Sequence, residues 1–108
     1  IYFLAVSRIY LKLGRVEAAR AASSEQINLI ENHSAFNYLE LCYLTHAESL
    51  RACGENEAAD TYLRKAYDRV MLVAGKTKDE ALLKSWLENV PWNREILREA
   101  KVRGITSD

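Results

Sequence analysis

The chain has 108 residues, of which 49% are hydrophobic and 28% are charged, and its 15 basic residues balance its 15 acidic residues. This composition is typical of one globular domain and excludes a disordered chain. Because binding to duplex DNA or to an anionic membrane depends on clustered positive charge, a neutral chain gives no electrostatic support for either partner. The longest apolar runs are too short to cross a bilayer, at residues 1–6 and 70–74.

The helix-breaking residues and the cysteines further limit the fold class and the kinds of site that the chain can have. Pro91 is the only proline and glycine is scarce, which favours long helices over a sheet with many turns. Cys42 and Cys53 do not form a Cys-x-x-Cys pair, so we expect reduced thiols rather than a zinc ribbon or a redox motif. The sequence thus predicts an all-α, cytoplasmic protein without a cofactor.

The first half of the chain predicts two helices and the start of a third. A helical pattern over residues 1–13 ends at Gly14, where a left-handed cap costs least. Small and apolar residues spaced three and four apart then predict a helix over residues 16–31. Residues 32–34 form a turn, with Ser34 as the N-cap of the next helix.

The third predicted helix runs from about Ala35 to Cys53 and ends at Gly54. Its apolar arc is too wide for a helix with one neighbour, so we expect it to be sandwiched between others. The arc comprises Phe36, Leu39, Leu41, Tyr43, Leu44, Ala47 and Leu50. A fourth helix follows over residues 56–74 and is expected to stop at Gly75.

Two further helices are predicted after this stop. Thr77 and Glu80 have the spacing of a capping box at the start of a fifth helix, which reaches about Asn89. Pro91 prevents its continuation and can open a short sixth helix that ends before Gly104.

A repeat links the two halves of the helical region. Four residues recur after a step of 40, namely Gly14, Glu17, Ala18 and Ala19 as Gly54, Glu57, Ala58 and Ala59. An echo of this kind is typical of stacked helical hairpins. Tyr10 precedes the first copy and Leu50 precedes the second, which is followed by Leu63 and Ala66. With these residues included, the pattern resembles the tetratricopeptide repeat.

The resemblance extends to the small residues Ser7 and Ala47, through which paired helices of that family pack. Ser23 and Gln26 depart from it, and the step exceeds the usual repeat of about 34 residues, which suggests lengthened helices. The resemblance implies antiparallel hairpins stacked as a right-handed superhelix with a C-terminal capping helix pair. The expected organisation is one domain over 1–104, with repeats at about 1–31 and 35–75, capping helices at about 78–103 and a frayed tail at 105–108.

Residues 85–97 are similar to the ending of such arrays in large bacterial signalling proteins, which join the array to an ATPase, a cyclase, a kinase or a DNA-binding domain. The resemblance implies a non-catalytic protein–protein interaction or scaffold module in a signalling or transcription-regulatory protein. Since the sequence begins without Met, we expect it to be a C-terminal piece of such a protein. The alternative is a small-molecule-sensing repeat domain that controls an upstream effector.

These hypotheses suggest two surfaces. A groove that binds a protein or peptide is expected at Phe36, Glu40, Tyr43 and Arg51. The first helix is apolar around much of its circumference, whereas a terminal repeat needs a polar outer face. We therefore expect a symmetric homodimer through Ile1, Tyr2, Phe3, Leu4 and Val6.

Several residues with reactive or metal-binding side chains allow both a functional and a structural interpretation. Cys42, His46 and Cys53 lie near one line of a helix and could hold zinc, but no fourth ligand is evident, so core positions are expected. His33 beside Ser34 lacks the third group of a catalytic triad. Without a nucleophile, phosphate-loop or metal signature, the chain is not expected to be an enzyme.

The exposed charged residues and the tryptophans also allow two interpretations each. Basic ridges could dock an acidic peptide, although a solvated face balanced by Glu95 and Glu99 is the simpler expectation. The ridges comprise Arg8, Lys12 and Arg15 on the first helix, and Arg94, Arg98 and Lys101 on the last. Trp86 and Trp92 could anchor a partner, but sealing the end of the core is favoured.

Overall fold

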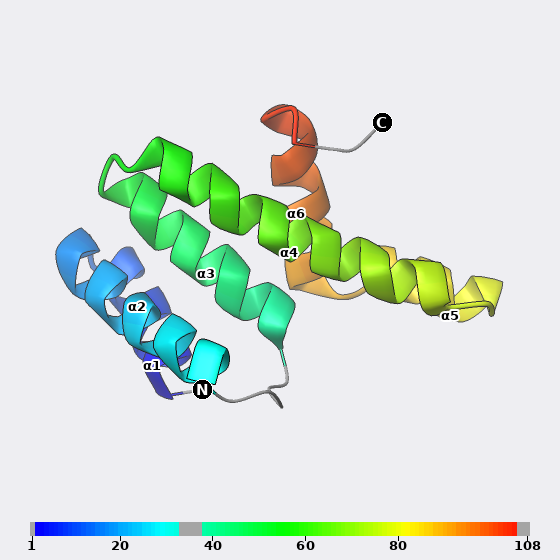
Figure 1. Ribbon diagram of the computed structural model, residues 1–108, viewed down its shortest axis with the longest axis horizontal. Coiled ribbons are helices and arrows are strands. Elements are labelled where there is room, and N and C mark those ends of the chain that lie inside the picture. The colour runs from blue at the N-terminus through cyan, green and yellow to red at the C-terminus, as the bar shows by residue number, and fades with distance from the viewer. Residues whose placement is uncertain (1, 33–37, 106–108) are drawn as a thin grey trace.

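The computed structural model describes residues 2–32 and 38–105, and these ranges fold into helices without a strand (Figure 1). The helices are α1 (Tyr2–Lys12), α2 (Val16–Asn32), α3 (Leu39–Ala52), α4 (Asn56–Lys76), α5 (Glu80–Glu88) and α6 (Pro91–Val102). The all-α prediction is confirmed. Pro91 occupies the first turn of α6, as the sequence predicts, because its fixed φ suits that position.

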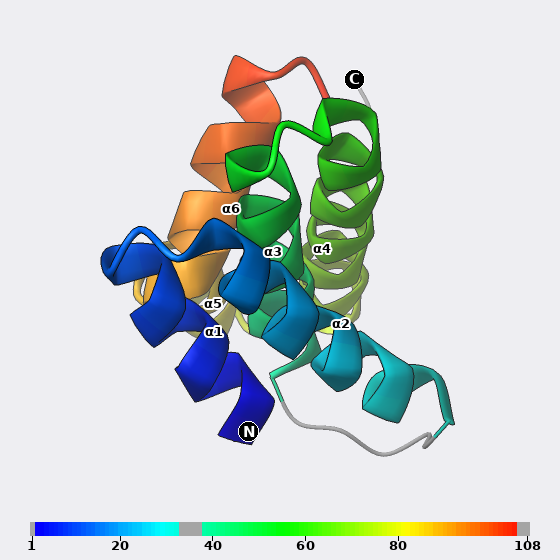
Figure 2. The ribbon, with the colours of Figure 1, turned by 90° about the vertical axis from the view of Figure 1, so that its left-hand side faces the viewer.

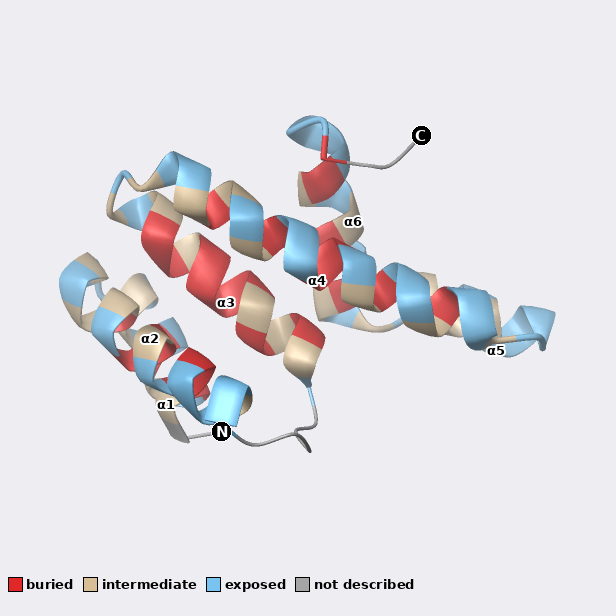
Figure 3. Cartoon of the chain, viewed as in Figure 1, coloured by how far each residue is buried: buried red, intermediate tan, exposed pale blue. Residues whose placement is uncertain are grey.

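Helix α3 lies at the centre of the molecule. α1 packs against α2, α3 packs against α4, and both α1 and α2 also contact α3. Helix α6 covers another side of α3 and contacts α4 as well, whereas α5 contacts α4 and α6 (Figure 2). Most of the α3 surface is consequently buried (Figure 3). The prediction that this helix is sandwiched is confirmed.

The main core lies between α3, α4 and α6. It consists of Leu44, Ala47, Leu63, Ala66, Tyr67, Val70, Ile96, Ala100 and Ile105. The sequence predicts a frayed tail from residue 105 onward, and this prediction is wrong for Ile105. Gly104 adopts φ 69° and turns the chain back, so that the amide of Ile105 donates to the Ala100 carbonyl at 2.8 Å and its side chain is buried. Residues 106–108 lie outside the described residues.

The glycine stops are confirmed at two positions and wrong at a third. Gly14 and Gly54 have φ values of 75° and 82°, as left-handed helix caps require. Gly75 lies instead within α4, which continues to Lys76. The helix ends at Thr77, which takes an extended conformation while its hydroxyl donates to the Val73 carbonyl at 2.8 Å.

Two predicted helix starts also need correction. Because Thr77 caps the end of α4, the predicted capping box does not form, and Asp79 caps α5 by accepting from the Leu82 amide at 3.0 Å. Helix α3 begins at Leu39 rather than at Ala35, because Tyr38 has a left-handed backbone with φ 62°. Ser34, the predicted N-cap, lies outside the described residues.

Alanine substitutions separate the two kinds of glycine. Gly54→Ala should lower the free energy of unfolding by about 1–2 kcal/mol, because alanine tolerates a left-handed backbone poorly. Gly75→Ala should raise it by about 0.5–1 kcal/mol, because the residue is helical and a Cβ there meets no atom within 4 Å. Urea denaturation measures both, and a destabilised Gly75→Ala would contradict the continuous α4.

Candidate functional site

The surface of α3 between α1 and α6 is the candidate site, and we call it the α1–α3–α6 face. Helices α1 and α6 each pack on α3, but in the described ranges their backbones make no contact with one another. The start of α1 lies by the start of α3, since Leu4 and Leu41 line one hollow, and Trp92 of α6 lines it as well. All three helices therefore begin at the same end of the face.

Buried hydroxyl groups hold α1 close to its neighbours. Ser7 is fully buried, and its Oγ donates to the Ala19 carbonyl of α2 at 2.8 Å. The same atom lies 3.1 Å from the Oγ of Ser49 on α3, which donates to the Thr45 carbonyl at 3.0 Å. Small polar side chains thus let three helix backbones approach while each hydroxyl keeps a partner.

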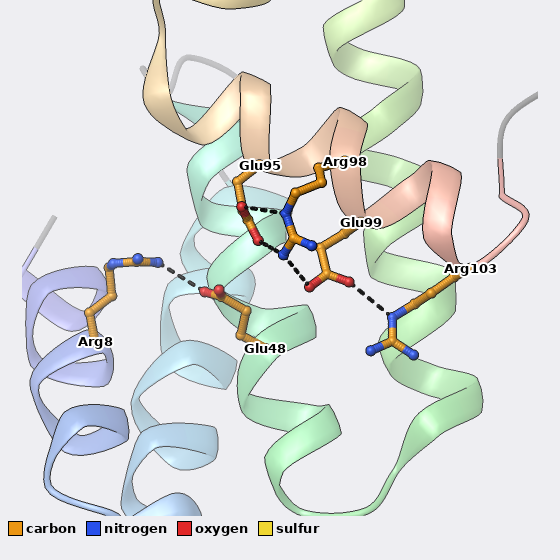
Figure 4. Close-up of polar contacts among 6 residues, drawn as sticks. All are labelled: Arg8, Glu48, Glu95, Arg98, Glu99 and Arg103. Carbon is orange, nitrogen blue, oxygen red and sulfur yellow. Dashed lines mark hydrogen bonds and ion pairs between the residues drawn. The ribbon is translucent and has the colours of Figure 1, made fainter.

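The middle of the face is charged (Figure 4). Arg8 of α1 donates to Thr45 at 2.9 Å and pairs with Glu48 of α3 at 3.0 Å. Burial raises the pKa of Glu48, Arg8 opposes this shift, and Glu95 and Glu99 of α6 add to it. Glu48 therefore lies between one cation and two like charges.

The carboxylates of α6 pair with Arg98 of the same helix and with Arg103, which caps its end. Arg98 bonds to Glu95 at 3.1 Å and to Glu99 at 3.1 Å, and Arg103 bonds to Glu99 at 3.2 Å. The hydrogen bond from Arg98 lowers the pKa of the Glu95 carboxyl. The expectation that Glu95 and Glu99 balance this basic ridge is confirmed for Arg98.

On α1, Lys12 is exposed and lines a hollow of about 210 Å³ with Arg8, Leu11 and Glu48.

The face is hollowed at both ends. An apolar hollow of about 300 Å³ opens between Leu4, Tyr38, Leu41 and Trp92. At the other end, a hollow of about 230 Å³ lies between α3, α4 and α6, and it includes Leu44, Glu48, Arg51, Leu63 and Glu99 in its lining. The face thus changes from apolar to charged along the direction of the helices.

The structure does not gather the residues proposed for a binding groove. Arg51 lines the hollow between α3, α4 and α6 and pairs with Asp60 of α4. Tyr43 lies against Tyr62 of α4, with ring centroids 6.2 Å apart. Glu40 is buried and lines another hollow, and Phe36 lies outside the described residues.

The residues proposed for self-association are also divided. Leu4 belongs to the core at 6% exposure, while Phe3 and Val6 are half-buried. Ile1 and the side chain of Tyr2 lie outside the description. Among the described residues of this region, the exposed large apolar side chains are Ile9 of α1, at 57%, and Leu13, which follows the end of α1, at 64%.

The cysteines and His46 are core or boundary residues, as expected. Burial raises the pKa of Cys42 to about 11, and Cys53 donates to the Val16 carbonyl at 3.4 Å. The Nδ1 of His46 lies 2.7 Å from Ser23 Oγ, and its ring meets the edge of Tyr62 at 4.5 Å. Among the described side chains, no group of three or more potential ligands could hold a metal ion.

A larger hollow of about 560 Å³ lies where α3 and α6 begin, beside α4 and α5. It is lined by Tyr38, Glu40, Arg69, Val73, Trp86, Asn89, Val90, Pro91 and Trp92. Trp86 donates to the Val70 carbonyl at 3.0 Å, and Trp92 meets Tyr38 edge to face at 5.6 Å. Both tryptophans pack against the core, which confirms that they seal its end, but they also form walls of this hollow.

In a comparison with known proteins, no family model, curated protein or solved structure matches the chain. In residues 2–32 and 38–105, no helix combines the length and the apolar character needed to span a membrane.

The environment of His46 predicts a pH-dependent stability. Burial, Arg20 and Lys65 lower its pKa from 6.5 to about 4. Between these values the unfolded chain binds a proton that the folded chain does not, so the free energy of unfolding should rise with pH across this window. The full gain is at most about 3 kcal/mol and is complete above the unfolded pKa. His46→Gln should flatten the slope in urea denaturation, and equal slopes would contradict the shift.

Proposed function

We propose that this domain is a non-catalytic interaction module that binds a peptide segment of a partner protein on the α1–α3–α6 face. The apolar hollow between Leu4, Leu41 and Trp92 carries this proposal. Its lining comes from three helices, so it exists only because α1 and α6 stand on either side of α3. A large apolar side chain of a peptide would fill it as an anchor.

The charged part of the face supports register and specificity. Arg8 and Glu48 lie beyond the hollow and are 44% and 37% exposed, so both remain accessible to a peptide. Exposed ion pairs contribute little to stability, and a partner's charge can replace one side of the pair at small cost. The expected peptide therefore carries an apolar anchor followed by charged residues.

The resemblance of the repeat to tetratricopeptide arrays supports the same function. Such arrays present an extended surface of successive helices to a partner. The similarity of residues 85–97 to the ends of arrays in bacterial signalling proteins supports our proposal that the module belongs to a larger cytoplasmic signalling or transcription-regulatory protein.

A displayed random-peptide library tests the proposal. Selected peptides should carry a large apolar residue, and binding should shift NMR resonances of α1, α3 and α6. Leu41→Ala should weaken binding about tenfold by removing part of the hollow's lining. Lys12→Glu should alter the charge preference, whereas Lys84→Glu on exposed α5 should not. Resonance shifts confined to α2 or α5 would contradict this face.

We also propose that two copies associate through the outer side of α1. Val6, Ile9 and Leu13 follow the helical spacing of one stripe, and the last two are more than half exposed. Burying such a stripe against its symmetry mate removes apolar surface from water.

Light scattering over a range of concentrations measures this association. The wild-type chain should dimerise, and Ile9→Lys should shift the equilibrium to monomer because it places a charge within the stripe. Val102→Lys is the matched control, since Val102 is 69% exposed on α6. A wild-type monomer at every concentration would contradict a dimer through α1.

The second candidate function is the sensing of a small molecule. The hollow at the start of α3 and α6 favours it, because about 560 Å³ is the size of ligand pockets in proteins. Its occupant would act on the partner-binding face or on an effector domain.

A further inference from the structure

We propose that the hollow between the starts of α3 and α6 binds a small zwitterion that carries both an ammonium and a carboxylate group. The inference rests on the sensing function proposed above and adds the chemical class of the ligand. It does not rest on the peptide-binding proposal.

Opposite charges on the walls of the hollow carry the inference. Glu40 of α3 is 7% exposed, and Arg69 of α4 is half-buried. Among the described residues, neither side chain forms an ion pair or a hydrogen bond, and the Nε of Arg69 is buried without a partner. Both charges line the same hollow, but they are not paired with each other.

A charged group that has lost water without gaining a partner is costly, and the buried Nε of Arg69 is in that position. A ligand with a single charge would pair with one side chain and leave the other without a partner. A zwitterion satisfies both, with its carboxylate on the Arg69 guanidinium and its ammonium on the Glu40 carboxylate.

The remaining walls fit the rest of such a ligand. Tyr38, Trp86 and Trp92 contribute aromatic surface, and Val73, Val90 and Pro91 contribute apolar surface. Aromatic faces attract cations and also stack on planar groups, which supports an ammonium with an apolar or aromatic substituent. An α-amino acid with such a side chain has this chemistry.

The backbone conformation of Tyr38, which lines the hollow, also supports a ligand site. Tyr38 holds a left-handed conformation, which is unfavourable for an aromatic residue, and it remains 48% exposed. That conformation sets its ring edge to face against Trp92 at 5.6 Å, on the wall of the hollow. Strained residues of this kind gather at ligand sites, where surrounding contacts hold them in place.

Three related compounds test the ligand class. L-phenylalanine carries both charges, 2-phenylethylamine lacks the carboxylate and 3-phenylpropionate lacks the ammonium. The chain has only two tryptophans, and both line the hollow, so their fluorescence reports its occupancy. L-phenylalanine should give a saturable change, and each singly charged analogue should bind at least about tenfold more weakly.

Paired variants assign each charge. Arg69→Gln should abolish the preference over 2-phenylethylamine, and Glu40→Gln should abolish the preference over 3-phenylpropionate. Arg64→Gln and Glu57→Gln on the exposed side of α4 are the matched controls and should leave both preferences unchanged. The comparison of ligands on the wild-type chain stands even where a variant fails to fold.

Two outcomes would overturn the inference and separate it from the sensing function. Equal or tighter binding of a singly charged analogue would show that the hollow takes a small molecule without selecting for both charges. The absence of a saturable change with all three compounds would remove both the zwitterion and the hollow as a small-molecule site.

Discussion

The structure depends on the burial of α3 by four other helices. A helix can contact α1, α2, α4 and α6 at once only where backbones approach closely, so small side chains occupy the junctions. Ser7 and Ser49 meet where α1 and α2 reach α3, while Ala47 and Ala66 lie in the core shared by α3, α4 and α6. The serines add a second constraint, because their hydroxyls must find partners in a buried place and thereby fix the position of α1. This packing places α1 and α6 on either side of α3 and thereby forms the α1–α3–α6 face.

Sequence patterns predicted the helices well where the signal is local. Gly14 and Gly54 end helices because few other residues tolerate their backbone, and Pro91 begins one for a similar reason. The errors at Gly75 and Thr77 arose where two local signals competed. Glycine is merely unfavourable inside a helix, so the packing of Ala74 and the hydroxyl of Thr77 could extend α4 past it. The burial of Ile105 depends on the core between α3, α4 and α6, which no local sequence pattern predicts.

The candidate site was harder to predict because it is made by contacts between helices. Glu40, Tyr43 and Arg51 share α3, yet the structure turns Glu40 to one hollow, Arg51 to another and Tyr43 towards α4. A usable signal was nevertheless present. Arg8 and Glu48 are separated by 40 residues, the step of the repeat, and they pair at 3.0 Å. Opposite charges one step of the sequence repeat apart can indicate such a pair, since equivalent positions lie side by side wherever repeats stack.

The apolar hollow of the α1–α3–α6 face and the larger hollow beside α4 share Tyr38 and Trp92 in their linings. The two rings are in contact, so a ligand that shifts either one changes the shape of both hollows. Binding at one place would then alter the affinity at the other by a coupling free energy that is the same in both directions. A peptide on the face and a zwitterion in the hollow would thus be linked through two side chains, without a change in how the helices pack. This arrangement would give the domain a physical route from sensing a small molecule to controlling a partner.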